Sequence, residues 1–400
     1  MKKNNKTPKL RFSGYTDDWE QRKLPEFVSF FNGLTYTPDD VQETGTLVLR
    51  SSNVKNGEIV DADNVYVSDE VVTSENVKEG DIIVVVRNGS RALIGKHAQI
   101  KASMPNTVIG AFMSGIRSEH SSFVNALLDT SAFENEIAKN MGATINQITG
   151  YMFSKMEFMI PSGEEQDKIG AYFKQLDHLI TLHQRKLEKL QNMKKSCLQK
   201  MFPKDGATVP EIRFSEFQGD WEERTLGSCF DERLESLPDG ELLSVTIGSG
   251  IKKFSELDRH DNSNTDKSKY KRVCIGDIAY NSMRMWQGAS GRSPYEGIVS
   301  PAYTVVKPIG DIDTQFFAYM FKKKEIIHLF EINSQGLTSD TWNLKYPAFS
   351  KIVVRVPRNV EEQSRIARFL LELDELISCT EQEIEITKRM KKGCLQKMFV

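Results

Sequence analysis

The sequence predicts an α+β protein made of two similar halves, each a mixed α/β domain followed by a long helix. Two observations carry this prediction: one sequence motif opens both halves, and a helix-forming segment closes both. Between them, short β-rich runs alternate with turns rich in Asn, Gly and Ser. A chain of 400 residues also exceeds the size of one ordinary domain, which favours two cores.

The repeat is visible at both ends of each half. Residues 8–24 read PKLRFSGYTDDWEQRKL, and residues 210–226 read PEIRFSEFQGDWEERTL. The closing segments begin with Glu-Glu-Gln and end with SCLQKMF (196–202) or GCLQKMF (393–399). Two matches in the same order establish an internal duplication. The halves diverge between these anchors, which suggests one scaffold that carries two different surfaces.

The closing segments, 164–202 and 361–399, have apolar residues at the 3.5-residue period of a coiled coil. A seam this long needs a partner, and the other copy is the economical one. Because the chain crosses a whole domain between the helices, we predict an antiparallel pair with pseudo-two-fold symmetry. The alternatives are packing of each helix on its own domain, or a homodimer. The predicted seam residues are Ile169, Phe173, Leu176, Ile180, Leu187, Leu190, Ile366, Leu370, Leu373, Ile377 and Ile384.

These segments set the expected domain boundaries. Prolines lie just upstream of both helices, at Pro161 and Pro357, where a helix can begin but cannot continue backwards. Within the domains we expect strands at 82–86 and 352–356, and helices at 122–140 and 314–331. The predicted parts are a first domain at 1–161, a first spacer helix at 162–203, a second domain at 204–357 and a second spacer helix at 358–400.

The composition argues against several classes of protein. Five cysteines without a CxxC pair fit a reduced cytosolic protein better than a disulfide framework. No apolar run approaches the roughly 18 residues that cross a membrane, and the N-terminus lacks a secretory signal, so a cytoplasmic location is expected. The formal net charge of −2 argues against bulk attraction to nucleic acid, so any DNA binding must depend on local charge placement.

We find no pattern typical of a catalytic site. Gly95-Lys96-His97 lacks the spacing and the Ser/Thr of a P-loop, and no GxGxxG opens a βαβ unit. The Asn/Asp-Pro-Pro-aromatic tetrapeptide of amino-methylating enzymes is missing. His178 and His183 are five residues apart and do not share a helix face, so no metal site is expected; His183 is better interpreted as a polar residue that sets the register of the seam.

The paired opening motifs and the Pro-then-Glu-Glu-Gln entry to each helix resemble the DNA-sequence specificity (S) subunits of type I restriction–modification enzymes. The resemblance covers essentially the whole chain. It implies a non-catalytic bacterial subunit, not an enzyme by itself, whose two target-recognition domains each read one half of an interrupted double-stranded DNA sequence. It further implies two methyltransferase (M) subunits with S-adenosylmethionine for adenine methylation, and two motor-nuclease (R) subunits with ATP and Mg²⁺ for cleavage.

The dimensions of the helices agree with such a reader. The 39 residues from Glu164 to Phe202 span roughly 58 Å at 1.5 Å per residue. That is a little over one and a half turns of duplex at about 3.4 Å per base pair. One polypeptide supplies both readers, so the target need not be palindromic. Phosphates are expected at Arg185, Lys186, Lys189, Lys194, Lys195, Lys200 and Lys204, and at residues 388–392.

Candidate base readers are polar side chains in loops that follow apolar runs. For each of them, the alternative is an ordinary turn residue. In the first domain the candidates are Arg50, Ser51, Asn53, Arg87, Asn88, Ser90, Arg91, Thr144, Asn146 and Gln147. In the second domain they are Lys252, Lys253, Asn281, Arg284, Arg292, Thr338, Ser339 and Asn343.

Two competing functions remain open from the sequence. One is a coiled-coil scaffold that binds partners without reading DNA, and the other is a fragment of a restriction or methylating enzyme. The missing catalytic motifs argue against the enzyme fragment. Diverged loops rich in Arg, Asn, Ser and Thr on a repeated frame favour recognition over scaffolding.

Overall fold

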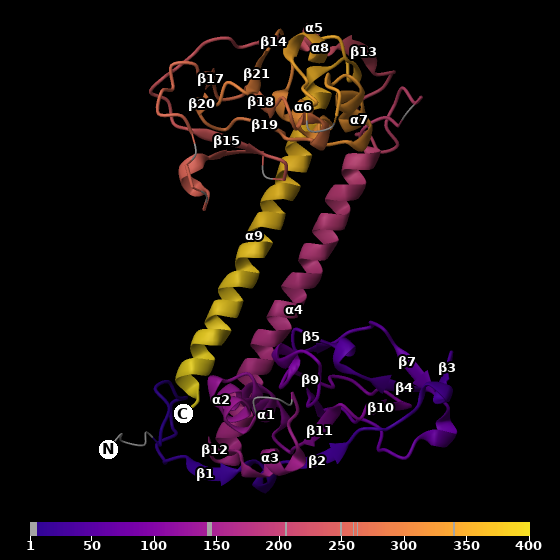
Figure 1. The fold of residues 1–400 in the computed structure, drawn as a ribbon, viewed down its shortest axis with the longest axis vertical. Coiled ribbons are helices and arrows are strands. Elements are labelled where there is room, and N and C mark those ends of the chain that lie inside the picture. Colours follow the sequence, from indigo (N-terminus) through magenta and orange to yellow (C-terminus); the bar gives the residue numbers. More distant parts are fainter. Residues whose placement is uncertain are drawn as a thin grey trace. The chain divides into compact units, whose positions relative to one another are not determined.

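The computed structural model describes residues 6–141, 146–204, 206–248, 250–258, 260–261, 263–338 and 341–400 (Figure 1). The chain forms two compact units. The first comprises Met1–Gln184 with Gln382–Val400, and the second comprises Arg185–Glu381. Each unit contains one mixed α/β domain and a part of each long helix.

The first domain contains two four-stranded sheets. One has the order β2-β11-β8-β9, all antiparallel, with strands β2 (Ser29–Asn32), β11 (Met113–Arg117), β8 (Ile82–Val85) and β9 (His97–Gln99). The other has the order β10-β4-β7-β3, with β10 (Thr107–Ile109) parallel to β4 (Thr46–Leu49), then β7 (Val65–Val67) and β3 (Val41–Gln42). The remaining elements are the strand pairs β1 (Glu20–Lys23) with β12 (Glu157–Ile160) and β5 (Val54–Lys55) with β6 (Glu58–Ile59), and helices α1 (Ser121–Leu128), α2 (Ser131–Asn140) and α3 (Gly150–Lys155).

The second domain repeats the all-antiparallel sheet. Its order is β14-β21-β18-β19, with strands β14 (Phe230–Glu232), β21 (Tyr303–Pro308), β18 (Ile278–Asn281) and β19 (Ser290–Arg292). The other strands form the pairs β13 (Glu222–Thr225) with β22 (Val353–Val356), β15 (Leu243–Thr246) with β16 (Gly250–Lys253), and β17 (Lys271–Val273) with β20 (Gly297–Val299). The helices are α5 (Leu226–Cys229), α6 (Thr314–Met320), α7 (Lys324–Ile332) and α8 (Tyr346–Phe349).

The central strand of each repeated sheet is buried on both faces. Successive side chains of a strand point to opposite faces, and in β8 Ile82 and Val84 belong to the helix-side core whereas Ile83 and Val85 belong to the core on the other face. In β18, Ile278 and Tyr280 take the helix side in the same way, and Ala279 takes the other. This burial on both faces accounts for the continuous apolar runs at these positions of the sequence.

The helical segment expected at 122–140 is two helices, α1 and α2. Thr130 separates them, because its hydroxyl accepts a hydrogen bond from the backbone N–H of Phe133 at 3.3 Å and so caps the start of α2. The segment expected at 314–331 is likewise divided into α6 and α7, and Asp313 caps α6 through the N–H groups of Gln315 and Phe316.

The two long helices are α4 (Gly163–Lys200) and α9 (Val360–Met398). In each unit the two helix parts lie side by side and run antiparallel (Figure 1). Every seam residue named above is buried or half-buried. None of the described helices is both long and apolar enough to span a membrane.

Lysines at polar positions of the seam are paired across the helices. Lys391 of α9 donates to Asp177 of α4, and also to Asp129, at 2.6 Å each. In the second unit Lys194 of α4 pairs with Asp374 of α9. The same Lys–Asp pair thus occurs once in each unit with the helices exchanged. A half-buried polar pair of this kind in the seam favours one register over others, and both units have the same register.

The opening motif is attached to the start of a helix by a buried ion pair. Arg11 forms a bidentate pair with Glu165 at 2.7 and 2.8 Å, and Arg213 forms one with Glu362 at the same two distances. The side chains of Glu165 and Glu362 are 0% and 2% exposed. The hydrogen bonds to these carboxylates raise the pKa of both arginines. The repeated Arg-Phe-Ser and Glu-Glu-Gln segments are therefore two sides of one contact.

The CLQKMF segments enter the domain cores next to the opening motifs. Phe399 lies edge-on to Trp19, at 6.2 Å between ring centres, and Phe202 lies edge-on to Trp221 at 6.1 Å. The backbone N–H of Leu10 donates to the carbonyl of Lys397 in one unit, and that of Ile212 donates to the carbonyl of Lys200 in the other. Each opening motif thus caps a helix C-terminus, whose last carbonyls lack partners within the helix.

The repeated Gly-Asp-Ile places a buried aspartate before the central strand. Asp81 accepts from the backbone of Lys78 and pairs with Arg117 at 2.8 Å. Asp277 accepts from the backbone of Cys274 and pairs with Arg233 at 2.6 Å. The aspartate is in the same place in both domains, whereas the arginine comes from β11 in one and follows β14 in the other.

Removal of one buried arginine should destabilise the fold strongly. Arg213→Ala leaves the Glu362 carboxylate buried without its cation, and we expect a loss of about 3–5 kcal/mol in the free energy of unfolding. Arg365→Ala is the matched control, because Arg365 pairs with Glu216 on the surface and should contribute less than about 1 kcal/mol. Urea denaturation followed by tryptophan fluorescence measures both. Equal, small losses would contradict an anchoring role for the Arg213–Glu362 pair.

Candidate nucleic-acid interface

Three separate loops meet on one surface of the first domain. The side-chain amide of Asn88 donates to the hydroxyl of Ser51 at 3.0 Å, and that of Asn146 donates to the carbonyl of Gly89 at 3.1 Å. Arg87 and Gln147 form an isolated β-bridge. The structure therefore brings together candidates from the segments at 50–53, 87–91 and 146–147, which we name the first loop cluster.

Arg87 is an exposed cation of the first loop cluster. It follows β8, and its guanidinium lies 5.0 Å from the centre of the Phe112 ring. Phe112 is 55% exposed although it is large and apolar. Stacking on an aromatic ring limits the rotamers of an arginine and leaves its edge free to donate. Ser90 and Arg91 are also exposed, at the start of the 3-10 helix η5 (Arg91–Leu93).

Other candidates of the first domain hold the loops in place. Asn53 is fully buried, and its amide donates to the carbonyl of Ala62 at 2.8 Å and to Asn64 at 3.0 Å, so it presents no exposed donor. Arg50 is half-buried and donates to the carbonyl of Asp63 at 2.6 Å. Asn53 and Arg50 thus shape the loop that carries Ser51. Thr144 lies outside the described residues.

The second domain brings two loops together at the corresponding place. The backbone N–H of Leu344 donates to the carbonyl of Ser282 at 2.8 Å, as that of Ile148 donates to Val86 in the first domain. Trp286 and Trp342 meet edge to face, with ring centres 5.3 Å apart. These contacts join the loop after β18 to the segment before α8. We name these two segments the second loop cluster.

Arg284 is the exposed candidate cation of the second loop cluster. It precedes the 3-10 helix η7 (Met285–Gln287). Asn281 ends β18 and accepts from the backbone of Met283 at 3.0 Å. Thr338 is exposed, and Asn343 forms a β-bridge with Gln335. Ser339 lies outside the described residues.

The remaining candidates of the second domain lie apart from Arg284. Arg292 is opposite Ile278, at the far end of β18, and its Nε donates to the hydroxyl of Thr314 at 3.0 Å. Lys252 and Lys253 lie on the β15–β16 hairpin, where Lys253 is within 3.9 Å of Glu241. Arg292 is therefore not part of the second loop cluster.

Several of the lysines expected to contact phosphates are engaged within the protein. Lys194 and Lys391 form the seam pairs described above, Lys204 pairs with Glu211, and Lys388 pairs with Glu385 at 3.3 Å. Seam pairing removes Lys194 and Lys391 from the set available to DNA. Lys204 and Lys388 lie on the surface, where such pairs are weak and exchange readily.

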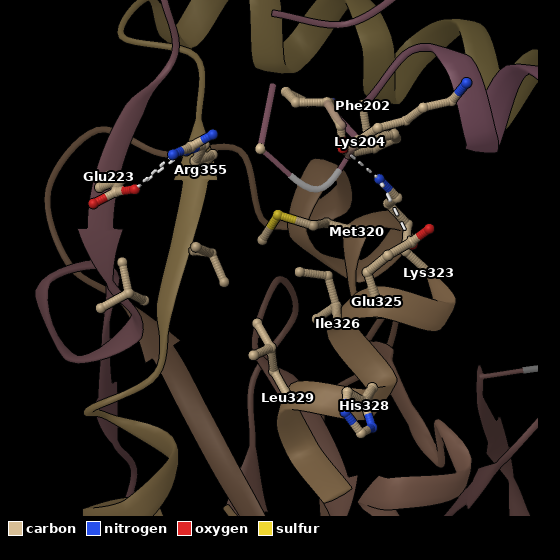
Figure 2. Close-up of a pocket in the computed structure, with 14 residues that line it drawn as sticks. Phe202, Lys204, Glu223, Met320, Lys323, Glu325, Ile326, His328, Leu329 and Arg355 are labelled. Carbon is tan, nitrogen blue, oxygen red and sulfur yellow. Dashed lines mark hydrogen bonds and ion pairs between the residues drawn. The ribbon is translucent and has the colours of Figure 1, made fainter. Parts of the chain in front are cut away.

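A cavity of about 270 Å³ lies in the second domain next to the end of α4 (Figure 2). Lys323 points from its wall toward the carbonyl of Pro203, to which it donates at 3.0 Å. Arg355 pairs with Glu223 at 2.9 Å on the opposite wall. These groups hold α4 and β22 in place, and the arrangement lacks the nucleophile–base geometry of an active site. Among the described residues, His, Cys, Asp and Glu form no cluster able to hold a metal ion.

The aromatic residues Phe112, Trp286 and Trp342 were not among the predicted site residues. Phe112 and Trp342 carry no hydrogen-bonding pattern of a base reader, and our sequence criteria selected polar side chains. Leu337, which is fully exposed beside Thr338, was not selected as a candidate for the same reason. An apolar residue in an otherwise polar loop is the sequence signal that could have found them.

Comparison with known proteins agrees with this architecture. Residues 16–192 match the family described as Type I restriction modification DNA specificity domain. The type I restriction enzyme MjaVIII specificity subunit of Methanocaldococcus jannaschii is 26% identical over 139 residues, which cover 33% of this chain and 32% of that protein. The chain thus matches about a third of the length of this curated relative.

Two solved structures are similar over nearly the whole chain. The crystal structure of a type I restriction-modification system S subunit from M. genitalium has a TM-score of 0.65 at 16% identity and covers 98% of this chain and 99% of that one. The HsdS subunit from Thermoanaerobacter tengcongensis has a TM-score of 0.43 at 16% identity, with 95% and 96% covered. The first of these shows the shared fold.

Residues 16–192 contain a type I DNA specificity domain. The whole chain has the fold of the M. genitalium S subunit. Over residues 16–192 the chain is therefore similar to the DNA specificity subunits of type I restriction–modification systems. The family inferred from the repeated motifs is confirmed, as is the predicted fold of two mixed α/β domains with two long, packed helices.

Arg87 and Arg284 should each contribute to specific DNA binding. We expect Arg87→Ala and Arg284→Ala each to weaken binding to the cognate duplex by about 1–3 kcal/mol, the range of a bidentate contact to a base. Binding to a duplex without the target should change much less. Arg22→Ala and Arg272→Ala are controls, because these exposed arginines pair with Glu20 and Glu296 away from the loop clusters. Fluorescence anisotropy of the assembled complex measures each affinity, and unchanged discrimination in both variants would remove these arginines from the set of readers.

Proposed function

We propose that this subunit recognises a bipartite, interrupted and asymmetric DNA sequence, one half with each domain. The observation that carries this proposal is a shared frame with different side chains. In both domains the central strand, β8 or β18, leads through a polar loop and a 3-10 helix to a left-handed glycine, Gly95 or Gly288, and then into the next strand. A constant frame with variable loops suits two readers of unlike sequences.

The exposed and half-buried polar groups of the two loop clusters have the chemistry for base recognition. Arginine donates a planar pair of hydrogen bonds that matches guanine, and asparagine or glutamine matches adenine. The first loop cluster offers Arg87, Arg91 and Gln147, and the second offers Arg284, Asn281 and Thr338. Because these sets differ, the two half-sites should differ, and the target should be asymmetric.

The exposed apolar residues add a second mode of contact. Phe112, on which Arg87 of the first loop cluster stacks, is exposed, as is Leu337 of the second domain, and Trp286 and Trp342 are half-buried. Apolar side chains at such a surface can contact thymine methyl groups or the faces of unstacked bases.

The helices α4 and α9 are proposed to set the gap between the half-sites. The 38 residues of α4 extend about 57 Å at 1.5 Å per residue. Two readers held at a fixed separation recognise half-sites at a fixed spacing, as dimeric DNA-binding proteins do.

Catalysis is proposed to belong to partner subunits. The M. genitalium structure bears the description of a type I restriction-modification S subunit. By analogy, two methyltransferase subunits with S-adenosylmethionine would methylate adenine at the target, and two motor-nuclease subunits with ATP and Mg²⁺ would cleave DNA that lacks the modification. The complex would act on cytoplasmic DNA.

A coiled-coil scaffold that does not touch DNA is the alternative. A scaffold gives no reason for an exposed arginine stacked on an exposed aromatic ring in one domain and an exposed arginine in the corresponding loop of the other. Arg87 on Phe112, and Arg284 two residues before the half-buried Trp286, favour recognition.

The direct test is the methylation pattern of DNA in cells. Single-molecule sequencing should show methyladenine at one interrupted, asymmetric motif when the chain is produced with its methyltransferase partner. Cells with the partner alone should lack that motif. Methylation at the same sites with and without the chain would support the scaffold instead.

A domain exchange tests whether the two readers are independent. Replacement of residues 25–160 by the corresponding segment of another specificity subunit should alter one half-site and leave the other half-site and the gap unchanged, because β8 and its loops lie within this segment. Sequencing of methylated DNA gives the new motif. A change in both halves would contradict modular recognition.

A further inference from the structure

Lys322 is a half-buried lysine that binds three backbone carbonyls. It lies between α6 and α7, and its ammonium donates to the carbonyls of Gly288 at 2.7 Å, Ser290 at 2.8 Å and Ile247 at 3.1 Å. An ammonium has three N–H donors, and each of them has a backbone partner here. Burial of a charged group is unfavourable unless such partners are present.

The three carbonyls belong to the segments that frame the second loop cluster. Gly288 and Ser290 end the loop that starts after β18 and contains Arg284 and η7. Ile247 lies in the turn between β15 and β16, the hairpin that carries Lys252 and Lys253. The ammonium of Lys322 therefore joins this turn to the Arg284 loop.

We propose that Lys322 is a positioning residue for recognition of the second half-site, because it fixes the Arg284 loop against the β15–β16 turn without touching DNA. The proposal rests on the DNA-reading function proposed above. Gly288 has φ +78°, a left-handed conformation that exposes its carbonyl, and the conformation of Gly288 sets where η7 and Arg284 lie. The hydrogen bond from Lys322 to the carbonyl of Gly288 therefore acts directly on the loop that carries Arg284.

The first domain supports this role, since it binds the equivalent carbonyl by another side chain. The strand pairing that places Ala98 opposite Ile83 places Gly291 opposite Ala279, so Gly95 corresponds to Gly288. Gly95 has φ +83°, and its carbonyl lies 3.1 Å from Nδ1 of His97. Both domains thus engage this glycine carbonyl, although with different residues from different elements.

The charge of Lys322 can be varied without mutation. Burial, together with the charge of Lys194, lowers the pKa of Lys322 to about 8. Lys194 comes from α4 and is paired with Asp374 of α9, and it lies 5.8 Å from the ring centre of Tyr319. Burial raises the pKa of Tyr319, so this tyrosine stays protonated in the range considered. The turn and the η7 loop face Lys322 with backbone carbonyls.

The test uses Lys322→Met, which keeps the length of the side chain and removes its charge and donors. Lys324→Met is the control, because Lys324 is an exposed lysine on the neighbouring α7. Each variant is assembled with its methyltransferase partner, and affinities are measured for the motif found by sequencing and for duplexes with single base-pair changes in either half-site. Lys322→Met should lower discrimination in the second half-site by about tenfold, the lower range of one lost base contact, and leave the first half-site unchanged.

The pH profile separates positioning from a merely structural role. The ammonium is present below about pH 8 and is lost above it, and a neutral amine cannot donate to all three carbonyls. Discrimination in the second half-site should therefore decrease from pH 7 to pH 9 in the wild type, while Lys322→Met should be independent of pH in this range.

The remaining outcomes are distinguishable. Unchanged discrimination in Lys322→Met, or an equal loss in both half-sites, would overturn the positioning role. If Lys322→Met fails to fold, the wild-type pH profile alone decides, and a flat profile in the second half-site rejects the proposal. A wild-type complex that shows no preference for any motif would instead contradict the proposed function.

Discussion

The buried pairs Arg11–Glu165 and Arg213–Glu362 are the contacts on which the rest of the architecture depends. Each joins an opening motif to the first turn of a long helix, and a carboxylate that is almost inaccessible to water needs this cation. The same opening motifs cap the C-terminal carbonyls of the other helix through Leu10 and Ile212. A helix start and a helix end are therefore held together in each unit, which fixes the antiparallel pair that the Lys391–Asp177 and Lys194–Asp374 contacts set in register.

This arrangement lets the surface diverge while the frame stays constant. The central strands, the buried aspartates Asp81 and Asp277 and the left-handed glycines occur in both domains, and they support loops of different composition. The contacts that hold the loops have also diverged. His97 contacts the carbonyl of Gly95 in the first domain, whereas Lys322 donates to the carbonyl of Gly288 in the second. In the proposed function, such a pair of unlike loop sets on a repeated frame would let one polypeptide specify an asymmetric target.

The sequence revealed what is encoded locally or by repetition, and much less of what depends on contacts between distant residues. The duplication, the long helices and the family follow from motifs and from the heptad period. A single sequence does not show that Arg11 meets Glu165, although both were recognised as repeated. Loop candidates were chosen by residue type, which does not separate exposed Arg87 from buried Asn53, or Arg284 from Arg292, whose side chain is directed to Thr314. The break between α1 and α2, where the hydroxyl of Thr130 caps the start of α2, was missed because apolar residues continue on both sides of it.

Site-specific photo-crosslinking to DNA tests the central claim most directly. A crosslinking amino acid replaces Phe112 in the first loop cluster or Trp342 in the second, and the complex is bound to a duplex that carries its methylation motif. Sequencing of the crosslinked strands then maps the bases that each position contacts. Two reading domains require crosslinks from Phe112 in one half-site only and from Trp342 in the other only. Crosslinks from both positions to the same half-site, or none within the motif, would contradict the account.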